Sequence, residues 1–187
     1  MGHEAKYRNA RICYYTGDFA WAQTQLNALK ASTSKLISND AIDLSLLITD
    51  NFNLDTIFEP MEIYARADLL IMQRRFDDAR LTLDTLIENY PGHSLEDEIL
   101  IVLGDLEMKE GDIDGAIEYY TEVVDLHFDD ITGDDALYNL ATIYDEILKD
   151  FGKAEELYSR LLFEFSGSLY TVEARKRFRE LTGELKE

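Results

Sequence analysis

The same pattern of residue sizes recurs four times along this 187-residue chain. Each copy has a small residue, then a leucine or tyrosine four positions later, then an aliphatic residue seven positions later. The small residues are Ala22, Ala79, Ala116 and Ala154. A small residue lets two helices approach closely, and larger residues one and two turns later fill the space where the helices diverge. The pattern therefore predicts four helix crossings of one kind.

Each crossing has a matching small residue on a preceding helix, at Ala10, Ala67, Gly104 and Ala141. Apolar residues elsewhere recur at the i, i+3, i+4 and i+7 spacing of helices, and the chain has two prolines and no good strand candidate. Turn signals such as Gly111-Asp112 separate the two helices of a copy, and the fourth copy gains one residue before Asp150. We therefore predict an all-α fold of helical hairpins.

In this register the sequence resembles the tetratricopeptide repeat, whose unit is about 34 residues long. The best matching segments are Gly-Asp-Phe-Ala-Trp-Ala at 17–22 and Gly-Asp-Ile-Asp-Gly-Ala at 111–116. The resemblance implies a right-handed α-solenoid, a single array over 1–187. The predicted repeats are about 3–34, 60–93, 97–130 and 134–167.

Two further helices are expected outside these repeats. The first gap between the alanines is longer than the others, and an extra helix fits at about 38–51, with a cap in Ser38-Asn39-Asp40. It either completes a degenerate repeat or packs alone across the array. A last helix at about 168–182 is expected to cap the array, because the final repeat otherwise leaves one face wet.

Charge and composition exclude several classes of function. The chain has 38 acidic and 18 basic residues, a net charge of -20, which repels nucleic acid and anionic lipid. No apolar run approaches the ~18 residues of a membrane span. One cysteine, Cys13, excludes an intramolecular disulfide. The chain as written is expected to be soluble, in the cytoplasm or, as a fragment of an exported protein, in the periplasm, and the sequence does not decide between them.

Motifs of catalysis and cofactor binding are missing from the sequence. There is no phosphate-binding glycine loop, nucleophile elbow or His-Glu-x-x-His motif, and the three histidines are far apart. Asn51, Asn53, Asp55 and Glu62 match part of a calcium loop, but Thr56 stands where that loop needs glycine. We therefore predict a protein that is not an enzyme and has no cofactor and no metal site.

Tetratricopeptide arrays bind protein segments in a concave groove lined by the first helix of each hairpin, so the resemblance implies a set of groove residues. They are Tyr7, Arg11, Tyr14, Met61, Tyr64, Asp68, Ile71, Glu98, Ile101, Asp105, Met108, Asp135, Tyr138 and Asp145. Acidic and tyrosine side chains dominate, which favours a partner with basic and apolar side chains over the carboxylate clamp of chaperone-binding relatives. A groove face that is merely solvated, or filled by the extra helix, is equally compatible with the residues.

The leading hypothesis is a non-catalytic scaffold for protein–protein interaction. The alternative is a regulatory or substrate-presenting module of a longer multidomain protein, such as an envelope-assembly component. Tyr-Pro-Gly-His-Ser at 90–94 and Phe-Ser-Gly-Ser at 165–168 resemble the bacterial branch of the family. The first repeat lacks a preceding cap, which leaves open a fragment of a longer protein and self-association through that edge.

Overall fold

Small side chains bring the two helices of each hairpin together, as the sequence predicted. In the computed structural model of the chain, all four alanines of the pattern are fully buried, and so are the residues four and seven positions later. The matching small residues on the first helices are buried as well. The pattern of residue sizes therefore coincides with buried positions in all four hairpins.

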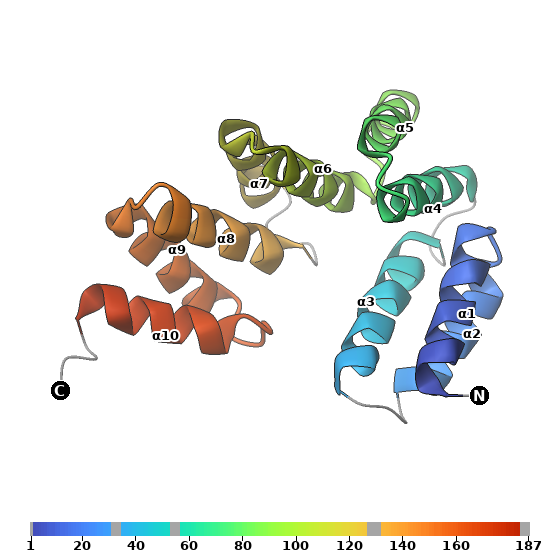
Figure 1. Cartoon of the computed structure of the whole chain (residues 1–187), viewed down its shortest axis with the longest axis horizontal. Helices are drawn as coiled ribbons and strands as arrows, with labels where there is room; N and C mark the ends of the chain where they lie inside the picture. Colours follow the sequence, from blue (N-terminus) through green and yellow to red (C-terminus); the bar gives the residue numbers. More distant parts are fainter. Residues whose placement is uncertain (1, 31–34, 53–56, 127–131, 184–187) are drawn as a thin grey trace. The chain divides into compact units, whose positions relative to one another are not determined.

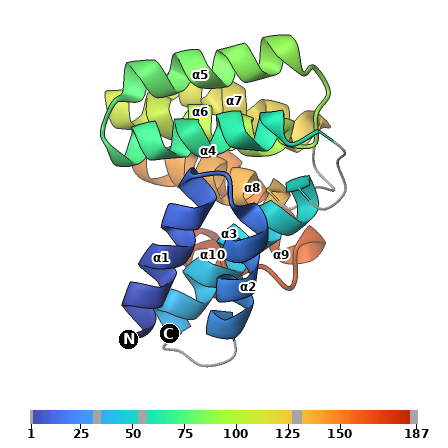
Figure 2. The same ribbon diagram turned by 90° about the vertical axis from the view of Figure 1, so that its right-hand side faces the viewer.

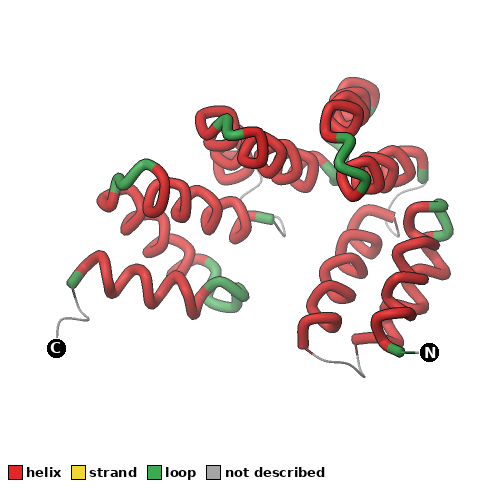
Figure 3. Tube along the Cα trace, viewed as in Figure 1, coloured by secondary structure: helices red, strands yellow, loops and turns green. Residues whose placement is uncertain are grey.

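The structure describes residues 2–30, 35–52, 57–126 and 132–183, and these form ten α-helices and one short π-helix (Figure 1). No strand occurs in those four ranges, so every regular element there is helical (Figure 3). The elements are α1 (His3–Tyr15), α2 (Phe19–Lys30), α3 (Lys35–Phe52), α4 (Glu59–Met72), α5 (Phe76–Asn89), α6 (Glu96–Glu110), α7 (Ile113–Leu126), α8 (Gly133–Thr142), the π-helix η1 (Ile143–Ile147), α9 (Phe151–Glu164) and α10 (Thr171–Thr182).

The chain divides into two compact units, Met1–Glu96 and Asp97–Glu187. The division falls at the start of α6, so the first unit contains α1 to α5 and the second contains nearly all of α6 and the helices after it. A single array over 1–187 stays a prediction.

In the first unit, α1 pairs with α2, α4 pairs with α5, and α3 packs against α2 and α1 (Figure 2). The α2–α3 contact includes polar bonds, because the Gln23 side chain donates to the hydroxyls of Ser45 and Thr49 at 2.7 and 2.9 Å. The ring of Phe52 lies between those of Phe19 and Phe58, with centroids 5.0 and 4.6 Å away. The extra helix is thus integrated into this unit.

The expected start of the extra helix was wrong. The helix begins at Lys35, so Ser38, Asn39 and Asp40 lie inside it and do not cap it. The final helix also differs in its start, because α10 begins at Thr171 and the expected start at 168 lies in the preceding turn.

In the second unit, α6 contacts α7 through Gly104 and Asp105, which both meet Tyr120. Helix α8 pairs with α9, and α10 packs on α9. The closest approach occurs at Gly104 of α6, where an added Cβ would lie 2.5 Å from a ring carbon of Tyr120 on α7. Side chains from all five helices form one apolar core, which includes Leu100, Tyr120, Leu137, Tyr158 and Ala174.

The turn inside each hairpin has a residue with positive φ, five positions before the buried alanine. Gly17 and Gly111 occupy it in the first and third hairpins, with φ of 80° and 85°. Arg74 and Lys149 occupy it in the other two, with φ of 61° and 58°, a conformation that a residue with a Cβ adopts at a cost. The turn geometry is therefore conserved among the hairpins although the residue type is not.

The extra residue of the fourth copy is absorbed by the π-helix. In the first three hairpins the amide of the residue just before the second helix donates to a carbonyl five residues earlier, for example Asp112 to Glu107 at 3.0 Å. In the fourth, the Asp150 amide reaches back six residues, to Tyr144 at 2.9 Å. The Leu148 amide bonds to the Ile143 carbonyl, which is the i to i+5 bond of a π-helix.

Candidate functional site

The predicted groove residues differ widely in their exposure. Five are buried among the packed helices, namely Tyr14, Met61, Tyr64, Glu98 and Asp145. The other nine are half-buried, namely Tyr7, Arg11, Asp68, Ile71, Ile101, Asp105, Met108, Asp135 and Tyr138. Only the second set has side-chain surface that a partner can reach without moving the helices.

Helix periodicity explains why some of these residues are buried. Tyr14 lies four positions after the contact residue Ala10, and Tyr64 lies three positions before Ala67. Residues three or four positions apart lie on the same face of a helix, so both tyrosines share the face that packs against neighbouring helices. Both are therefore core residues of the first unit.

In the first unit, the half-buried residues form a polar cluster across α1 and α4. The Arg11 guanidinium contacts the Tyr15 hydroxyl and lies 3.7 Å from the sulfur of Met72. The Tyr15 hydroxyl also bonds with the Asp68 carboxyl. Next to this cluster, the Tyr7 hydroxyl donates to the Asp40 carbonyl of α3 at 3.4 Å. The one basic side chain of the predicted groove is thus already engaged within the protein.

Burial governs the protonation of this cluster. Burial raises the pKa of the Asp68 carboxyl above its usual value, although Arg11 and the bond from Tyr15 act in the opposite direction. Burial, together with the charge of Asp68, raises the pKa of Tyr15 to about 12. The tyrosine therefore remains a neutral hydrogen-bond donor at neutral pH.

In the second unit, the predicted residues on α8 contact the start of α10. The ring of Tyr138 stacks on that of Tyr170, with centroids 4.2 Å apart and planes 12° from parallel. The Tyr170 hydroxyl donates to the Asp135 carboxylate at 2.5 Å. These two predicted groove residues are therefore engaged in contacts with Tyr170 at the start of α10.

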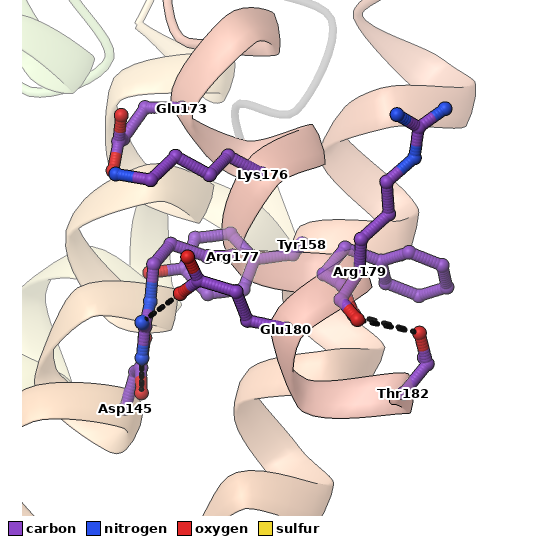
Figure 4. A network of polar contacts seen from close by, with 9 residues as sticks. Asp145, Tyr158, Glu173, Lys176, Arg177, Arg179, Glu180 and Thr182 are labelled. Atoms are coloured by element: carbon purple, nitrogen blue, oxygen red, sulfur yellow. Dashed lines mark hydrogen bonds and ion pairs between the residues drawn. The ribbon is translucent and has the colours of Figure 1, made fainter. Parts of the chain in front are cut away.

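Asp145 of the π-helix also contacts α10. Arg177 donates to both of its carboxylate oxygens, and Tyr158 donates to one of them at 3.3 Å (Figure 4). Arg177 contacts Glu180 as well. The bonds from Arg177 hold the pKa of the Asp145 carboxyl below its usual value. Asp145 is thus a structural anion that links two elements.

A cavity of about 410 Å³ opens between α6, α7 and the α8–η1 segment. It contains Asp105 and Met108 of the predicted groove. The complete lining is Asp105, Met108, Lys109, Tyr120, Asn139, Thr142, Ile143, Glu146 and Ile147. The Tyr120 hydroxyl donates to Asp105 at 2.7 Å, which fixes the orientation of that carboxylate. The cavity therefore combines apolar walls with two carboxylates and one ammonium group.

Sequence reasoning missed Glu146 and Ile147 as parts of this site. Both are exposed, and both belong to the π-helix. The spacing between the small residues of a hairpin is twelve positions in the first three copies and thirteen between Ala141 and Ala154. That difference was the available signal, because an inserted residue rotates the side chains after it to another face.

Within the described ranges, no three or more His, Cys, Asp or Glu side chains are placed to bind a metal ion together. Of the partial calcium loop, Asn51 is buried and accepts a hydrogen bond from Ser94 at 2.7 Å, while Asn53 and Asp55 lie outside the described residues. In the same ranges no helix has the length and apolar content needed to cross a bilayer.

Repeated antiparallel hairpins with a small residue at each crossing define a helical-repeat protein, and the cavity lies on the first helices of two such hairpins. The sequence matches the tetratricopeptide repeat model over residues 64–130 and again over 101–168. The chain belongs to the tetratricopeptide repeat family. A search among curated proteins returns no match.

Proposed function

We propose that this protein is a non-catalytic scaffold that binds a segment of another protein through the cavity between α6, α7 and α8–η1. Tetratricopeptide repeats are in general protein–protein interaction modules and typically not catalytic. The observation that carries the proposal is that Asp105, Met108 and Thr142, from the first helices of two consecutive hairpins, line one cavity.

The chemistry of the lining selects the kind of segment. Asp105 and Glu146 supply negative charge, while Met108 and Ile147 supply apolar surface. The net charge of -20 attracts cationic segments from a distance and repels acidic ones. A segment with lysine or arginine next to aliphatic residues gains from both effects.

Fluorescence anisotropy with a library of labelled peptides tests this function. We expect peptides with basic and aliphatic residues to bind best, and their affinity to fall as salt rises. Preferred binding of acidic peptides, or no binding by any peptide, would contradict the proposal.

A pair of charge-reversal variants locates the site. Glu146→Lys changes an exposed residue of the cavity, and we expect at least about tenfold weaker binding from the loss of a charge-assisted contact. Glu155→Lys makes the same change of charge at an exposed position on α9 and should have little effect. Equal losses in both variants would place the binding surface elsewhere.

A second pair of variants tests whether apolar contact at the cavity contributes to binding. Ile147→Ser removes an exposed apolar side chain at the cavity, whereas Phe163→Ser removes one on α9. Phe163 is 87% exposed and Ile147 is 45% exposed, so neither change should unfold the protein. Weaker binding by the Ile147 variant alone supports the assignment.

Bacterial origin, a place in envelope assembly and self-association through the first hairpin stay predictions. They call for separate experiments on the protein in its native source.

A further inference from the structure

The cavity of the second unit owes part of its lining to the inserted residue of the fourth hairpin. Ile143, Glu146 and Ile147 all belong to the π-helix, and all three line the cavity. Asp145, between them in sequence, is fully buried and bonded to Arg177. In the π-helix, the carboxylate of Asp145 thus bonds to α10, and the next carboxylate, that of Glu146, lines the cavity.

The two carboxylates of the cavity differ in exposure and in hydrogen bonding. Asp105 is half-buried and accepts a hydrogen bond from Tyr120 at 2.7 Å, so its position is fixed before any partner arrives. Glu146 is exposed and comes from a different element, the π-helix. A cation that enters the cavity can therefore contact one preorganised carboxylate, while the second adjusts to it.

The same cavity also has apolar side chains in its lining. Met108 and Ile147 offer apolar surface, and the thioether of Met108 adapts to the shape of a neighbour. A ligand that suits this lining has a long apolar stem and a cationic end with several donors.

We propose that this cavity is an anchor site for a single arginine side chain of the bound segment, an inference that rests on the proposed function. The stem of arginine packs against Met108 and Ile147, and its planar guanidinium has five donors that can reach Asp105 and Glu146 together. Lysine has a compact and strongly hydrated charge, which is harder to bring between apolar walls.

The ammonium group of Lys109 competes with an incoming cation for the carboxylates of the cavity. Lys109 lines the same cavity, and its ammonium group is 3.4 Å from the backbone carbonyl of Asp105. Because it is exposed, it can move aside, but its charge opposes an incoming cation. Lys109→Ala is therefore expected to strengthen the binding of arginine peptides about threefold, a gain typical of one exposed charge pair.

The test uses the methyl groups of methionine as reporters in the full chain. Met108 lies in the cavity, and Met72, which is 52% exposed, lies in the first unit. The probes are the tripeptides acetyl-Leu-Arg-Leu-amide and acetyl-Leu-citrulline-Leu-amide, which have nearly the same shape and differ in charge. With ¹³C-methyl methionine, we expect the arginine peptide to shift the Met108 signal but not the Met72 signal. Binding of the citrulline peptide should be at least about tenfold weaker.

Two variants support the assignment. Glu146→Gln keeps the shape of the side chain and should reduce the preference for arginine over citrulline, while Glu155→Gln on α9 should not change it. Equal binding of both peptides, or shifts confined to Met72, would overturn the anchor site.

The proposed function and the anchor site can fail separately. If library peptides bind and Glu146→Lys weakens them, but replacement of their arginines by citrulline has no effect, the anchor site is wrong and the proposed function stands. If no library peptide binds, the proposed function is wrong. If no library peptide binds but the arginine tripeptide still shifts the Met108 signal, the cavity binds a small guanidinium compound and does not bind protein segments. That result also overturns the anchor proposal.

Discussion

Arg177 of α10 donates two hydrogen bonds to the carboxylate of Asp145 in the π-helix, from Nε to Oδ2 and from Nη2 to Oδ1, each 2.8 Å long. The Asp145 side chain is 1% exposed and that of Arg177 is 31% exposed. The pair therefore fastens the last helix to an element that lies before α9 in the sequence. Paired geometry of this kind is stronger than a single contact between charges.

The first prediction concerns this pair. Arg177→Ala should lower the free energy of unfolding by about 2 kcal/mol, because it leaves a buried carboxylate without its cation. The value is below the roughly 3 to 5 kcal/mol of a fully buried pair, since Arg177 is partly solvated. Urea denaturation followed by circular dichroism measures it, and Arg175→Ala, an exposed position on the same helix, is the control.

The pair also predicts a pH dependence. The pKa of Asp145 is below its usual value in the folded protein, so the contribution of the pair is complete above the unfolded-state pKa of about 3.9. That contribution is lost as the pH falls toward the folded-state pKa. The difference in stability between the parent and Arg177→Ala should therefore be largest near neutral pH and shrink below about pH 4. A difference that stays constant as the pH falls well below 4 would contradict this account.

A second prediction uses the close contact of Gly104 with Tyr120. An alanine at an exposed helix position is about 1 kcal/mol better than glycine. Here the new Cβ would lie 2.5 Å from the Tyr120 ring, so Gly104→Ala should instead destabilise the protein by about 1 to 3 kcal/mol. Gly152→Ala, whose Cβ would meet nothing closer than 3.7 Å, is the control and should be neutral or stabilising.

A double variant separates the steric effect from other causes. Leu26 and Leu83 stand at the position of Tyr120 in the hairpins where alanine replaces Gly104. The variant with both Gly104→Ala and Tyr120→Leu should therefore lose less unfolding free energy than the sum of the losses of the two single variants. Simple additivity in the unfolding free energies would mean that the ring and the new methyl group do not collide.

A third prediction concerns the turn of the second hairpin. Arg74 is exposed and has φ of 61°, where the third hairpin has Gly111. Arg74→Gly should stabilise the protein by up to about 1 kcal/mol, and Gly111→Arg should destabilise it by about 1 kcal/mol or more. If backbone strain is the cause, the melting temperature should rise in Arg74→Gly and fall in Gly111→Arg, relative to the parent protein.

A fourth prediction tests the crossings themselves. Ala116→Leu and Ala154→Leu insert bulk at fully buried positions, and each should cost about 1 to 3 kcal/mol. Ala20→Leu on the exposed face of α2 should leave the melting temperature almost unchanged. Equal behaviour of all three variants would mean that the alanines do not lie at tight crossings.

A fifth prediction follows from the packing of the hairpins without any metal-ligand motif in the sequence. Dialysis against a chelator should leave helicity and the melting temperature unchanged, because side-chain packing stabilises helical repeats. A fall of several degrees that calcium reverses would point to the segment between Asn51 and Glu62.

The hairpin register could be predicted from the sequence because it depends on residue size at fixed spacing. Ala22 and Ala79 are fully buried, and a recurring small residue at such a spacing is visible without a structure. The exposure of Tyr64 was less predictable, because a groove position and a packing position differ by a small rotation about the helix axis. Burial of such a residue depends on neighbours from other helices.

The cavity was predictable only in part. Asp105 and Met108 follow from the repeat register, since they occupy regular positions on α6. Glu146 and Ile147 do not, because the extra residue of the fourth hairpin could have been absorbed in a longer turn as well as in a helix. The choice depends on the bond between Leu148 and Ile143, and sequence spacing alone does not specify it.

The fit between Gly104 and Tyr120 has a consequence for how such repeats can be recombined. In a chimaera with α4 in place of α6, Ala67 would face the tyrosine ring and bring a methyl group into the space that the ring fills. The two helices of the third hairpin are therefore matched to each other and must be transplanted together. For this hairpin, the interchangeable module is the pair and not the single helix.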